Sequence, residues 1–470
     1  MRYYKRNALS RRSFVQRCLT TAGATGLGAF GGLSAFQRLA MAGEAAPAGS
    51  TKDRYYVFVY FSGGWDILLS LDPRDPNTFH QGNTSITQIQ PAYEQLDDPG
   101  NDGSLIYTPN GTPLGPYAGP LAAHWDQLAI VRGMSMETLT HEVGRRRFLT
   151  GKPPTGLLAR GSSAATWFAS QLGSEQAIPN LSVRVETYNV DQPNYATGLK
   201  VASVPDLVRS LKTSDPALDP KLDMLIDQML AQSAECGLAQ GSPTWQKAEG
   251  SRGKAREMVS SGFDALFDFQ AKTDAMAQVR QHYGIGASGS AALQTPEAQA
   301  AMAATALKSG ISRCVSFTGA SGLDTHYDDW QTDQGPTQER GYNAVARLAE
   351  DLAATEYKGT GASWLDHTVI VGFSEFSRTP MLNARTGRDH HLNNACFLLG
   401  GPVKGQTIVG ASTDVGMQPG AVDLATGLPT KDPEAEILKP EHVIQGMFDE
   451  LGVEGDPADL RVDPLTALFS

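Results

Sequence analysis

Cysteine is scarce in this chain of 470 residues, and its placement excludes two classes of protein. The four cysteines are widely spaced and form no CxxC pair: Cys18, Cys236, Cys314 and Cys396. Small secreted domains held by a disulfide framework, and zinc sites built from thiolates, both need clustered cysteines. We therefore expect at most one bridge. A chain of this length with 41% hydrophobic residues is instead able to bury a large apolar core.

Positive charge is the second shortage. The formal net charge is −11, and the first 42 residues hold seven Lys/Arg and no acid, so the remainder carries 32 basic against 50 acidic residues, a net charge of −18. Nucleic acids and anionic lipids attract clustered Lys and Arg, and no basic stripe is present to compensate. The composition therefore excludes a nucleic-acid partner.

A strongly apolar run is also missing. The longest mildly apolar stretch, 18–36, contains five glycines, which makes it a weak candidate for a membrane span of ~20 residues. It follows the pair Arg11-Arg12 and precedes the small-residue site Ala40-Met41-Ala42. A charged start, paired arginines, a weak apolar region and a small-residue site together predict a twin-arginine signal peptide that is cleaved after Ala42.

The predicted signal sets the domain plan and the location. We expect a signal peptide at 1–42, a short linker at 43–53 and one large domain at 54–470. The expected partners during export are the twin-arginine translocase and signal peptidase, and the mature protein would reside in the periplasm or at the cell surface without a stable membrane span. Because this route carries folded proteins, often with a cofactor in place, it is compatible with a metal inserted early.

Short apolar or β-branched runs alternate with amphipathic segments along the large domain. The expected strands are Tyr55 to Phe61, Leu128 to Val131, Leu181 to Val185, Cys314 to Phe317, Thr368 to Phe373 and Ala395 to Leu399. Helical periodicity marks 340–354 and 442–451, and a helical insertion is expected at about 205–283. This alternation predicts an α/β fold with a mostly parallel, doubly wound sheet and helices on both faces.

Unusual polar residues follow several of these strands. In such sheets ligands bind at the carboxyl ends of the strands, so residues there are candidates for a common site. They are Asp66, Thr140, His141, Asp324, His326, Glu375, Arg378, Arg388, Asp389, His390 and His391. Carboxylate and imidazole ligands without thiolate suit a divalent ion, namely zinc, manganese, calcium or magnesium.

Each of these residues also has a structural explanation. Asp66 follows a Gly-Gly turn, where an aspartate is more often a helix cap than a ligand, and Asp324 with His326 is compatible with a solvated turn. Glu375 and Arg378 have the i, i+3 spacing of a surface ion pair. Thr140 suits the N-cap of the helix that follows it. The adjacent histidines beside Asp389 have the weakest packing rationale, which favours a functional role for them.

The motifs taken together resemble a widespread domain-of-unknown-function family of twin-arginine-exported bacterial proteins, distantly similar to sulfatases and the alkaline phosphatase superfamily. The resemblance covers about Arg54 to about Leu468. It is carried by the motifs Gly63-Gly64-Trp65-Asp66, Asp324-Thr325-His326, Glu375 to Pro380, Gly387 to His391 and Leu399 to Gly405. It implies an alkaline phosphatase-like fold.

The resemblance also implies roles for individual residues. Asp66, Asp324, His326, Glu375 and the late histidines would take ligand positions, and Thr140 or His141 would lie near the nucleophile position. Phe376 stands where superfamily enzymes commonly have a metal-binding histidine, so a full two-metal site does not carry over. No cysteine stands in the Cys-x-Pro-x-Arg signature that sulfatases modify, which argues against ordinary sulfatase chemistry.

The sequence favours an exported metal-dependent hydrolase acting on a phosphate or other charged ester, with a small anionic ester or glycan as substrate. The metal would polarise the ester and activate Thr140 or a bound water, while Arg378 or Arg388 would stabilise the anionic transition state. His141 has three roles open to it: metal ligand, general base or hydrogen-bond donor behind the site. The alternative is a noncatalytic exported protein that keeps the fold and serves in binding or cell-envelope assembly.

Overall fold

The computed structural model describes residues 52–156, 158–212 and 219–469. The predicted signal peptide and its cleavage site after Ala42 lie outside the described residues. The described chain divides into two compact units, a larger one within Ala46–Leu211 and Gly262–Ser470 and a smaller one within Lys212–Ser261.

An eight-stranded sheet forms the centre of the larger unit, in the order β12-β4-β11-β8-β1-β7-β5-β6. Its strands are β1 (Tyr55–Phe61), β4 (Leu128–Ser135), β5 (Asn180–Val183), β6 (Leu199–Val201), β7 (Cys314–Ala320), β8 (Thr368–Phe373), β11 (Asn393–Leu399) and β12 (Thr407–Val409). Only β11 runs antiparallel to its neighbours. All seven residues of β1 are buried, as a strand covered on both faces requires. The predicted α/β class and mostly parallel sheet are confirmed.

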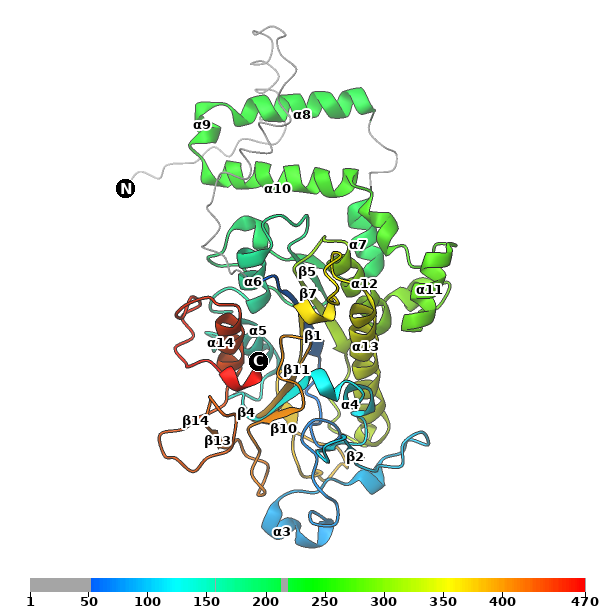
Figure 1. Cartoon of the computed structure of the whole chain (residues 1–470), viewed down its shortest axis with the longest axis vertical. Helices are drawn as coiled ribbons and strands as arrows, with labels where there is room; N and C mark the ends of the chain where they lie inside the picture. The colour runs from blue at the N-terminus through cyan, green and yellow to red at the C-terminus, as the bar shows by residue number, and fades with distance from the viewer. Residues whose placement is uncertain (1–51, 157, 213–218, 470) are drawn as a thin grey trace, which may run out of the picture. The chain divides into compact units, whose positions relative to one another are not determined.

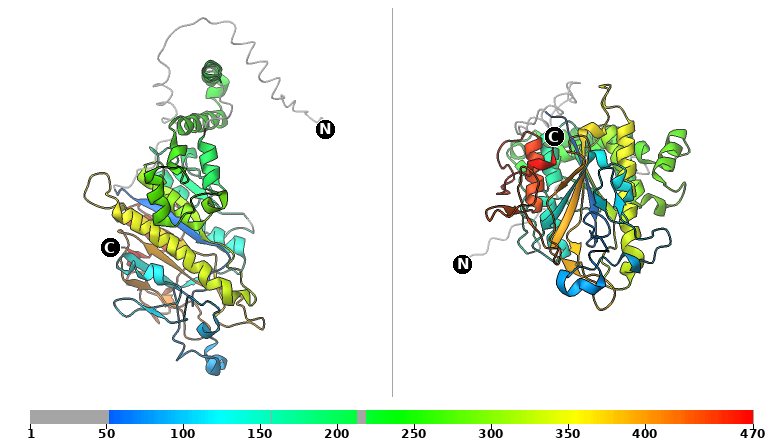
Figure 2. Two further views of the ribbon diagram at one scale, coloured as in Figure 1. Left: turned by 90° about the vertical axis from the view of Figure 1, so that its right-hand side faces the viewer. Right: turned by 60° about the horizontal axis from the view of Figure 1, so that its bottom comes forward.

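Helices cover both faces of this sheet (Figures 1 and 2). One face is covered by α12 (Pro296–Lys308) and α13 (Gly335–Ala354), and the other by α5 (His141–Thr150), α6 (Ala164–Leu172) and α14 (Pro440–Glu450). In α13 the buried side chains recur at helical spacing: Tyr342, Val345, Leu348, Ala349 and Leu352. This apolar stripe anchors the helix on the sheet while its polar face remains in solvent.

Shorter elements decorate the larger unit. The helices among them are α3 (Thr84–Thr87), α4 (Gly119–Ala122), α7 (Val204–Leu211) and α11 (Asp274–Tyr283). Three small ladders pair β2 (Ile106–Tyr107) with β3 (Pro113–Leu114), β9 (Ser377–Arg378) with β10 (His390–His391), and β13 (Ala421–Val422) with β14 (Glu436–Ile437). The ladder of β9 and β10 carries part of the candidate site.

The smaller unit is helical. It contains α8 (Pro220–Ala234), α9 (Gly237–Gln240) and α10 (Pro243–Ser260). Ion pairs join α8 to α10, with Arg252 Nη1 at 2.7 Å from Asp227 Oδ1 and Arg256 Nη2 at 2.6 Å from Asp223 Oδ2. The sequence places α7 and α11 in the same insertion of about 205–283. In the structure both helices belong to the larger unit. The domain boundaries stay a prediction.

No helix in the described part of the chain is both long enough and apolar enough to cross a bilayer.

The topology brings several strand ends together. Because β1, β4, β7 and β8 run the same way and β11 runs against them, the carboxyl ends of four strands meet the start of β11 at one edge of the sheet. Tyr60 of β1 pairs with Phe373 of β8 there, and Asn393 of β11 pairs with Ser135 of β4. The loops that leave this edge carry the predicted site residues.

Candidate metal centre

Three histidines from three different segments aim their Nε2 atoms at one carboxylate oxygen. His141 is the first residue of α5, His326 lies in the loop after β7, and His390 lies in β10. Their Nε2 atoms are 3.4, 3.0 and 3.1 Å from Asp324 Oδ1. His326 Nε2 is also 3.0 Å from His390 Nε2. Within the described residues, the Nε2 or Nδ1 atoms of His141 and His390 and a carboxylate oxygen of Asp324 lie within 4.8 Å of one another.

The opposite ring nitrogen of each histidine is held by an acceptor. His141 Nδ1 is 2.7 Å from Glu375 Oε1, His326 Nδ1 is 2.8 Å from Asp389 Oδ1, and His390 Nδ1 is 2.7 Å from the carbonyl oxygen of Leu139. A carboxylate or carbonyl only accepts, so each Nδ1 must carry the proton. In a neutral imidazole the Nε2 atom then presents a lone pair. Three such lone pairs and a carboxylate oxygen therefore face one another.

The local charge is negative. The carboxylates of Asp324, Glu375 and Asp389 surround the neutral rings, and one guanidinium, that of Arg378, lies among them. Burial by itself raises the pKa of Asp324, but the hydrogen bond and the charge of Arg378 help to outweigh it and hold that pKa well below its usual range. Asp324 is therefore a carboxylate over the whole physiological pH range, and the three carboxylates outnumber the one guanidinium among them.

The histidines differ in basicity. Burial lowers the pKa of His141, but the hydrogen bond and charge of Glu375, with the charge of Asp324, more than compensate, so the pKa is raised. Burial lowers the pKa of His390 despite its bonds to the Leu139 carbonyl and Asp324. His141 is thus the ring on which a proton competes first when the pH falls.

Only one of the two adjacent histidines faces the cluster. In a strand, neighbouring side chains point to opposite sides, and β10 pairs His390 with Arg378 and His391 with Ser377. His391 points instead toward Gln418, whose Nε2 lies 3.4 Å from its own Nε2. Burial lowers the pKa of His391 to about 4. His390 therefore faces the cluster and His391 does not, while the ligand roles of both stay predictions.

Two predicted ligands lie behind the histidines. The Glu375 side chain is 1% exposed and accepts hydrogen bonds from Gly63 N (3.0 Å) and Ser374 Oγ (2.9 Å) besides His141. Asp389 Oδ1 accepts from Asn383 Nδ2 (3.2 Å) besides His326. Both carboxylates orient an imidazole, an arrangement typical of the groups that stand behind metal-ligating histidines.

Asp66 and Arg388 form a buried ion pair, and their predicted roles as ligand and anion binder stay predictions. Asp66 Oδ2 is 2.9 Å from Arg388 Nε and accepts from Trp330 Nε1 at 2.8 Å, while Oδ1 accepts from Leu68 N. The remaining donors of Arg388 bind the carbonyl oxygens of Thr379, Gln90 and Pro91. Both side chains are fully buried. Asp66 therefore resembles the cap alternative, and Arg388 is fully buried, paired with Asp66 and bonded to three backbone carbonyls.

Arg378 also has its donors occupied. Its Nε donates to the carbonyl oxygen of Gly64. Its Nη1 donates to the carbonyl oxygen of Arg388 and lies 3.4 Å from His326 Nε2. Its Nη2 donates to the carbonyl oxygen of Gly63 and to Asp324 Oδ1. The turn makes this possible, because Gly63 has φ +115° and a Cβ there would lie 2.6 Å from the backbone nitrogen of Leu323. The Gly-Gly turn thus holds Arg378, and Arg378 holds Asp324. The predicted contact of Arg378 with a transition state stays a prediction, and its observed partners give it a structural role.

Thr140 occupies the N-cap position of α5 and is exposed. Its side chain makes no capping hydrogen bond, although its own N–H donates to Thr138 Oγ1. The hydroxyl therefore stands next to His141 without the local partner that the capping alternative requires. The assignment of Thr140 as nucleophile stays a prediction.

The buried Phe376 ring packs against two histidines of the cluster. Its ring centroid is 4.3 Å from that of His390 and 4.8 Å from that of His141, and the side chain is fully buried. The sequence marked this residue as a departure from a two-metal pattern but gave no sign of its packing role. The Leu139 carbonyl was not predicted either, because any residue supplies a backbone carbonyl.

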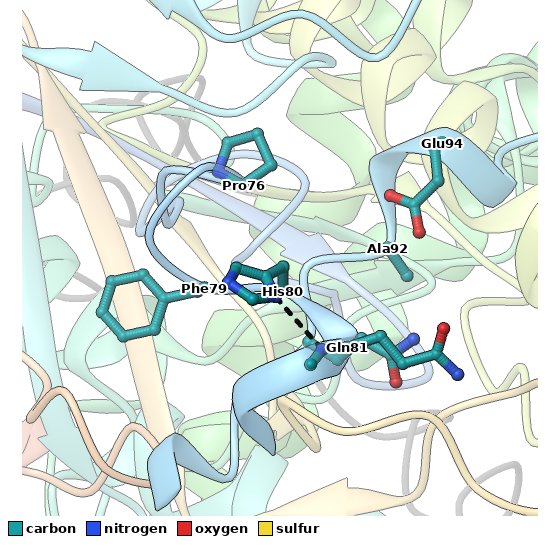
Figure 3. Close-up of a pocket in the computed structure, with 8 residues that line it drawn as sticks. Pro76, Phe79, His80, Gln81, Ala92 and Glu94 are labelled. Atoms are coloured by element: carbon teal, nitrogen blue, oxygen red, sulfur yellow. Dashed lines mark hydrogen bonds between the residues drawn. The ribbon is translucent and has the colours of Figure 1, made fainter.

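A separate hollow of about 250 Å³ lies in the segment between β1 and β4 (Figure 3). It is lined by Pro76, Phe79, His80, Gln81, Gly82, Gln90, Ala92 and Glu94. His80 Nδ1 accepts from Gly82 N, so that ring caps a turn. With one histidine and one carboxylate this hollow offers fewer metal donors than the histidine cluster.

Comparison with known proteins gives a family and weak structural similarities. No match was found among curated proteins. Among solved structures, the chain is similar to Ps i-CgsB, solved in complex with k-i-k-neocarrahexaose, at 10% identity and a TM-score of 0.32, covering 88% of this chain and 75% of that one. It is also similar to BT4656, solved in complex with its substrate D-glucosamine-2-N,6-O-disulfate, at 9% identity and a TM-score of 0.31, covering 88% and 79%.

A family model matches residues 53–425, which span the sheet and every residue of the histidine cluster. The chain therefore belongs to the family described as protein of unknown function (DUF1501).

Proposed function

We propose that this protein is an exported, metal-dependent hydrolase of a phosphate or other charged ester, with one divalent ion held by His141, His326, His390 and Asp324. The observation that carries the proposal is the convergence of three imidazole Nε2 atoms on one carboxylate oxygen. Such an arrangement is repulsive without a cation between the lone pairs, because every Nδ1 is already committed as a donor.

The distances from Asp324 to the three histidines, and that between His326 and His390, fit ligands of a single ion. Zinc binds imidazole nitrogen and carboxylate oxygen at ~2.0–2.2 Å in tetrahedral geometry, which places two ligand atoms roughly 3.3 Å apart. The distances from Asp324 Oδ1 to the three Nε2 atoms are 3.0–3.4 Å. Calcium and magnesium prefer oxygen ligands, so a set of three nitrogens and one oxygen favours zinc, with manganese next.

The chain's own residues prepare this site. Glu375 and Asp389 keep the Nδ1 protons on His141 and His326, so the Nε2 lone pairs stay directed inward. Arg378 keeps Asp324 ionised and fixed. An ion held here would supply Lewis-acid charge to an ester oxygen. Thr140, exposed beside His141, is the proposed nucleophile, and a water molecule is the alternative. Export is proposed on the twin-arginine signal at 1–42.

One observation favours the noncatalytic alternative. Phe376 packs against two of the histidines where a second metal ligand would stand in a two-metal enzyme. A protein that binds one ion here without hydrolysing esters would serve in binding or cell-envelope assembly.

The test compares two adjacent histidines. The mature protein is stripped of metal and reloaded, bound metal is counted by mass spectrometry, and hydrolysis of aryl phosphates, phosphodiesters and aryl sulfates is measured. We expect one ion per chain in the parent and in His391→Ala, and loss of both the ion and the activity in His390→Ala. Metal retained by His390→Ala would overturn the site. A metal-loaded parent that hydrolyses none of these esters would overturn the hydrolase and favour the noncatalytic alternative.

A further inference from the structure

We propose that Arg385, whose guanidinium stacks on the Tyr327 ring, binds the anionic group of the substrate. This group would be a phosphate or a sulfate. The inference rests on the proposed function and names the substrate group that this site would take. It assigns the anion-binding role, predicted from the sequence for Arg378 or Arg388, to a different arginine.

Three other arginines near the cluster are already paired with carboxylates. Arg378 and Arg388 are fully buried and bind backbone carbonyls and the carboxylates of Asp324 and Asp66. Arg145, one helical turn after His141, forms an ion pair with Glu186 at 3.2 Å. Each of these three guanidinium groups therefore already has its charge paired with a carboxylate.

Arg385 is exposed, and its Nη1 atom is engaged in a hydrogen bond. Its guanidinium carbon lies 4.5 Å from the centroid of the Tyr327 ring, and its Nη1 donates to the Tyr327 hydroxyl at 3.1 Å. Among the described residues, no hydrogen bond or ion pair engages its Nε or Nη2. A guanidinium that is stacked on a ring keeps its plane fixed, so these donors form a preorganised fork of the kind that pairs with phosphate or sulfate oxygens.

The Tyr327 ring, on which Arg385 stacks, adjoins the proposed metal site. Tyr327 directly follows His326 in the chain, and its ring is half exposed. Asn383 donates to the carbonyl oxygen of His326 at 3.0 Å and to Asp389 Oδ1 at 3.2 Å, and its Oδ1 accepts from Arg385 N at 2.8 Å. One amide therefore ties the Arg385 loop to a proposed ligand and to the carboxylate behind it.

The loop also lies directly on the ligand segment. A Cβ on Gly387 would lie 2.2 Å from the carbonyl carbon of His326, so only glycine permits this approach. Arg385 is thus held at the rim of the centre, exposed to solvent and rigidly related to His326.

The experiment measures anion binding apart from turnover. Inorganic phosphate and inorganic sulfate are titrated into the metal-loaded protein by calorimetry at low ionic strength, with metal content measured in parallel. We expect Arg385→Ala to weaken phosphate binding about tenfold or more, since a charge-assisted pair is lost. We expect Arg385→Lys to recover part of that affinity without the fork geometry. Bound metal should be unchanged in both variants.

The matched control is Arg347→Ala. Arg347 is another half-exposed arginine, paired with Glu350 at 3.1 Å on α13, twelve residues or roughly 18 Å beyond the start of that helix. It should leave phosphate affinity unchanged. With any ester that is hydrolysed, Arg385→Ala should raise KM by a similar factor while kcat changes little.

Three outcomes decide the matter. Unchanged phosphate affinity in Arg385→Ala would overturn the inference, and so would loss of the metal, because Arg385 would then act on the ligands and not on the anion. A parent that binds phosphate in an Arg385-dependent manner but hydrolyses no ester would support this inference and overturn the proposed activity.

Discussion

Replacing Glu375 with glutamine tests how the metal centre is held. The Glu375 carboxylate accepts from His141 Nδ1, Gly63 N and Ser374 Oγ, and its side chain is 1% exposed. Glutamine has the same shape, and its carbonyl oxygen is able to accept from His141 and Gly63 while its amide faces Ser374. The fold should therefore survive, and the change should remove only the charge behind His141.

The expected loss follows from that geometry. Without the carboxylate, the Nδ1 proton of His141 is held by a neutral acceptor, the ring is less basic, and the Nε2 atom is a poorer ligand. Carboxylates in this position typically contribute a factor of ~10–100 in metal affinity, or about 1.4–2.7 kcal/mol. We expect the zinc dissociation constant of Glu375→Gln, measured by competition with a chelating dye, to rise by such a factor.

A buried carboxylate elsewhere provides the control. Glu441 is also buried and pairs with Arg147 Nη2 at 2.7 Å on the far side of α5. Glu441→Gln should lower thermal stability without changing zinc affinity. If Glu375→Gln binds zinc as tightly as the parent, or if both variants weaken zinc equally, the reasoning about Glu375 is refuted.

Four further predictions follow from the same residues. Asp66→Asn should leave the fully buried Arg388 charge unpaired and lower the free energy of unfolding by about 3 kcal/mol in a urea titration, with metal content unchanged. Zinc affinity should fall between pH 8 and pH 6, because the raised pKa of His141 lets protons compete there first, and calorimetry in two buffers should show proton release on binding. Thr140→Ala should abolish ester hydrolysis while bound metal and melting temperature stay unchanged; retained activity would favour a water nucleophile. Changing Arg11 and Arg12 to Lys should leave uncleaved precursor in the cytoplasm on an immunoblot, and normal export of that variant would remove the signal assignment.

Much of the sheet could be read from the sequence. Strands such as β1 and β8 are covered on both faces, so they appear as unbroken apolar runs with the observed bounds. The direction of β11 was not predictable, because an apolar run carries no information on whether its partner runs parallel. The edge strands β6 and β12 have three residues each and include partly exposed positions, which leaves too short a pattern to recognise.

The candidate site was predictable to the level of strand ends and no further. The sequence placed Asp324, His326 and His390 at one edge of the sheet, and the structure brings them together. It placed Asp66 there too, but its burial against Arg388 depends on a partner more than 300 residues away, which no local pattern reveals. The choice between His390 and His391 depends on the pairing of β9 with β10, a tertiary contact.

The most direct test of the metal centre is a crystal structure of the zinc-loaded mature protein, with anomalous data recorded on both sides of the zinc edge. We predict a single strong anomalous peak bonded to Nε2 of His141, His326 and His390 and to Asp324. An anomalous map with no peak between these four side chains, or with its peak at another group of residues, would contradict the account.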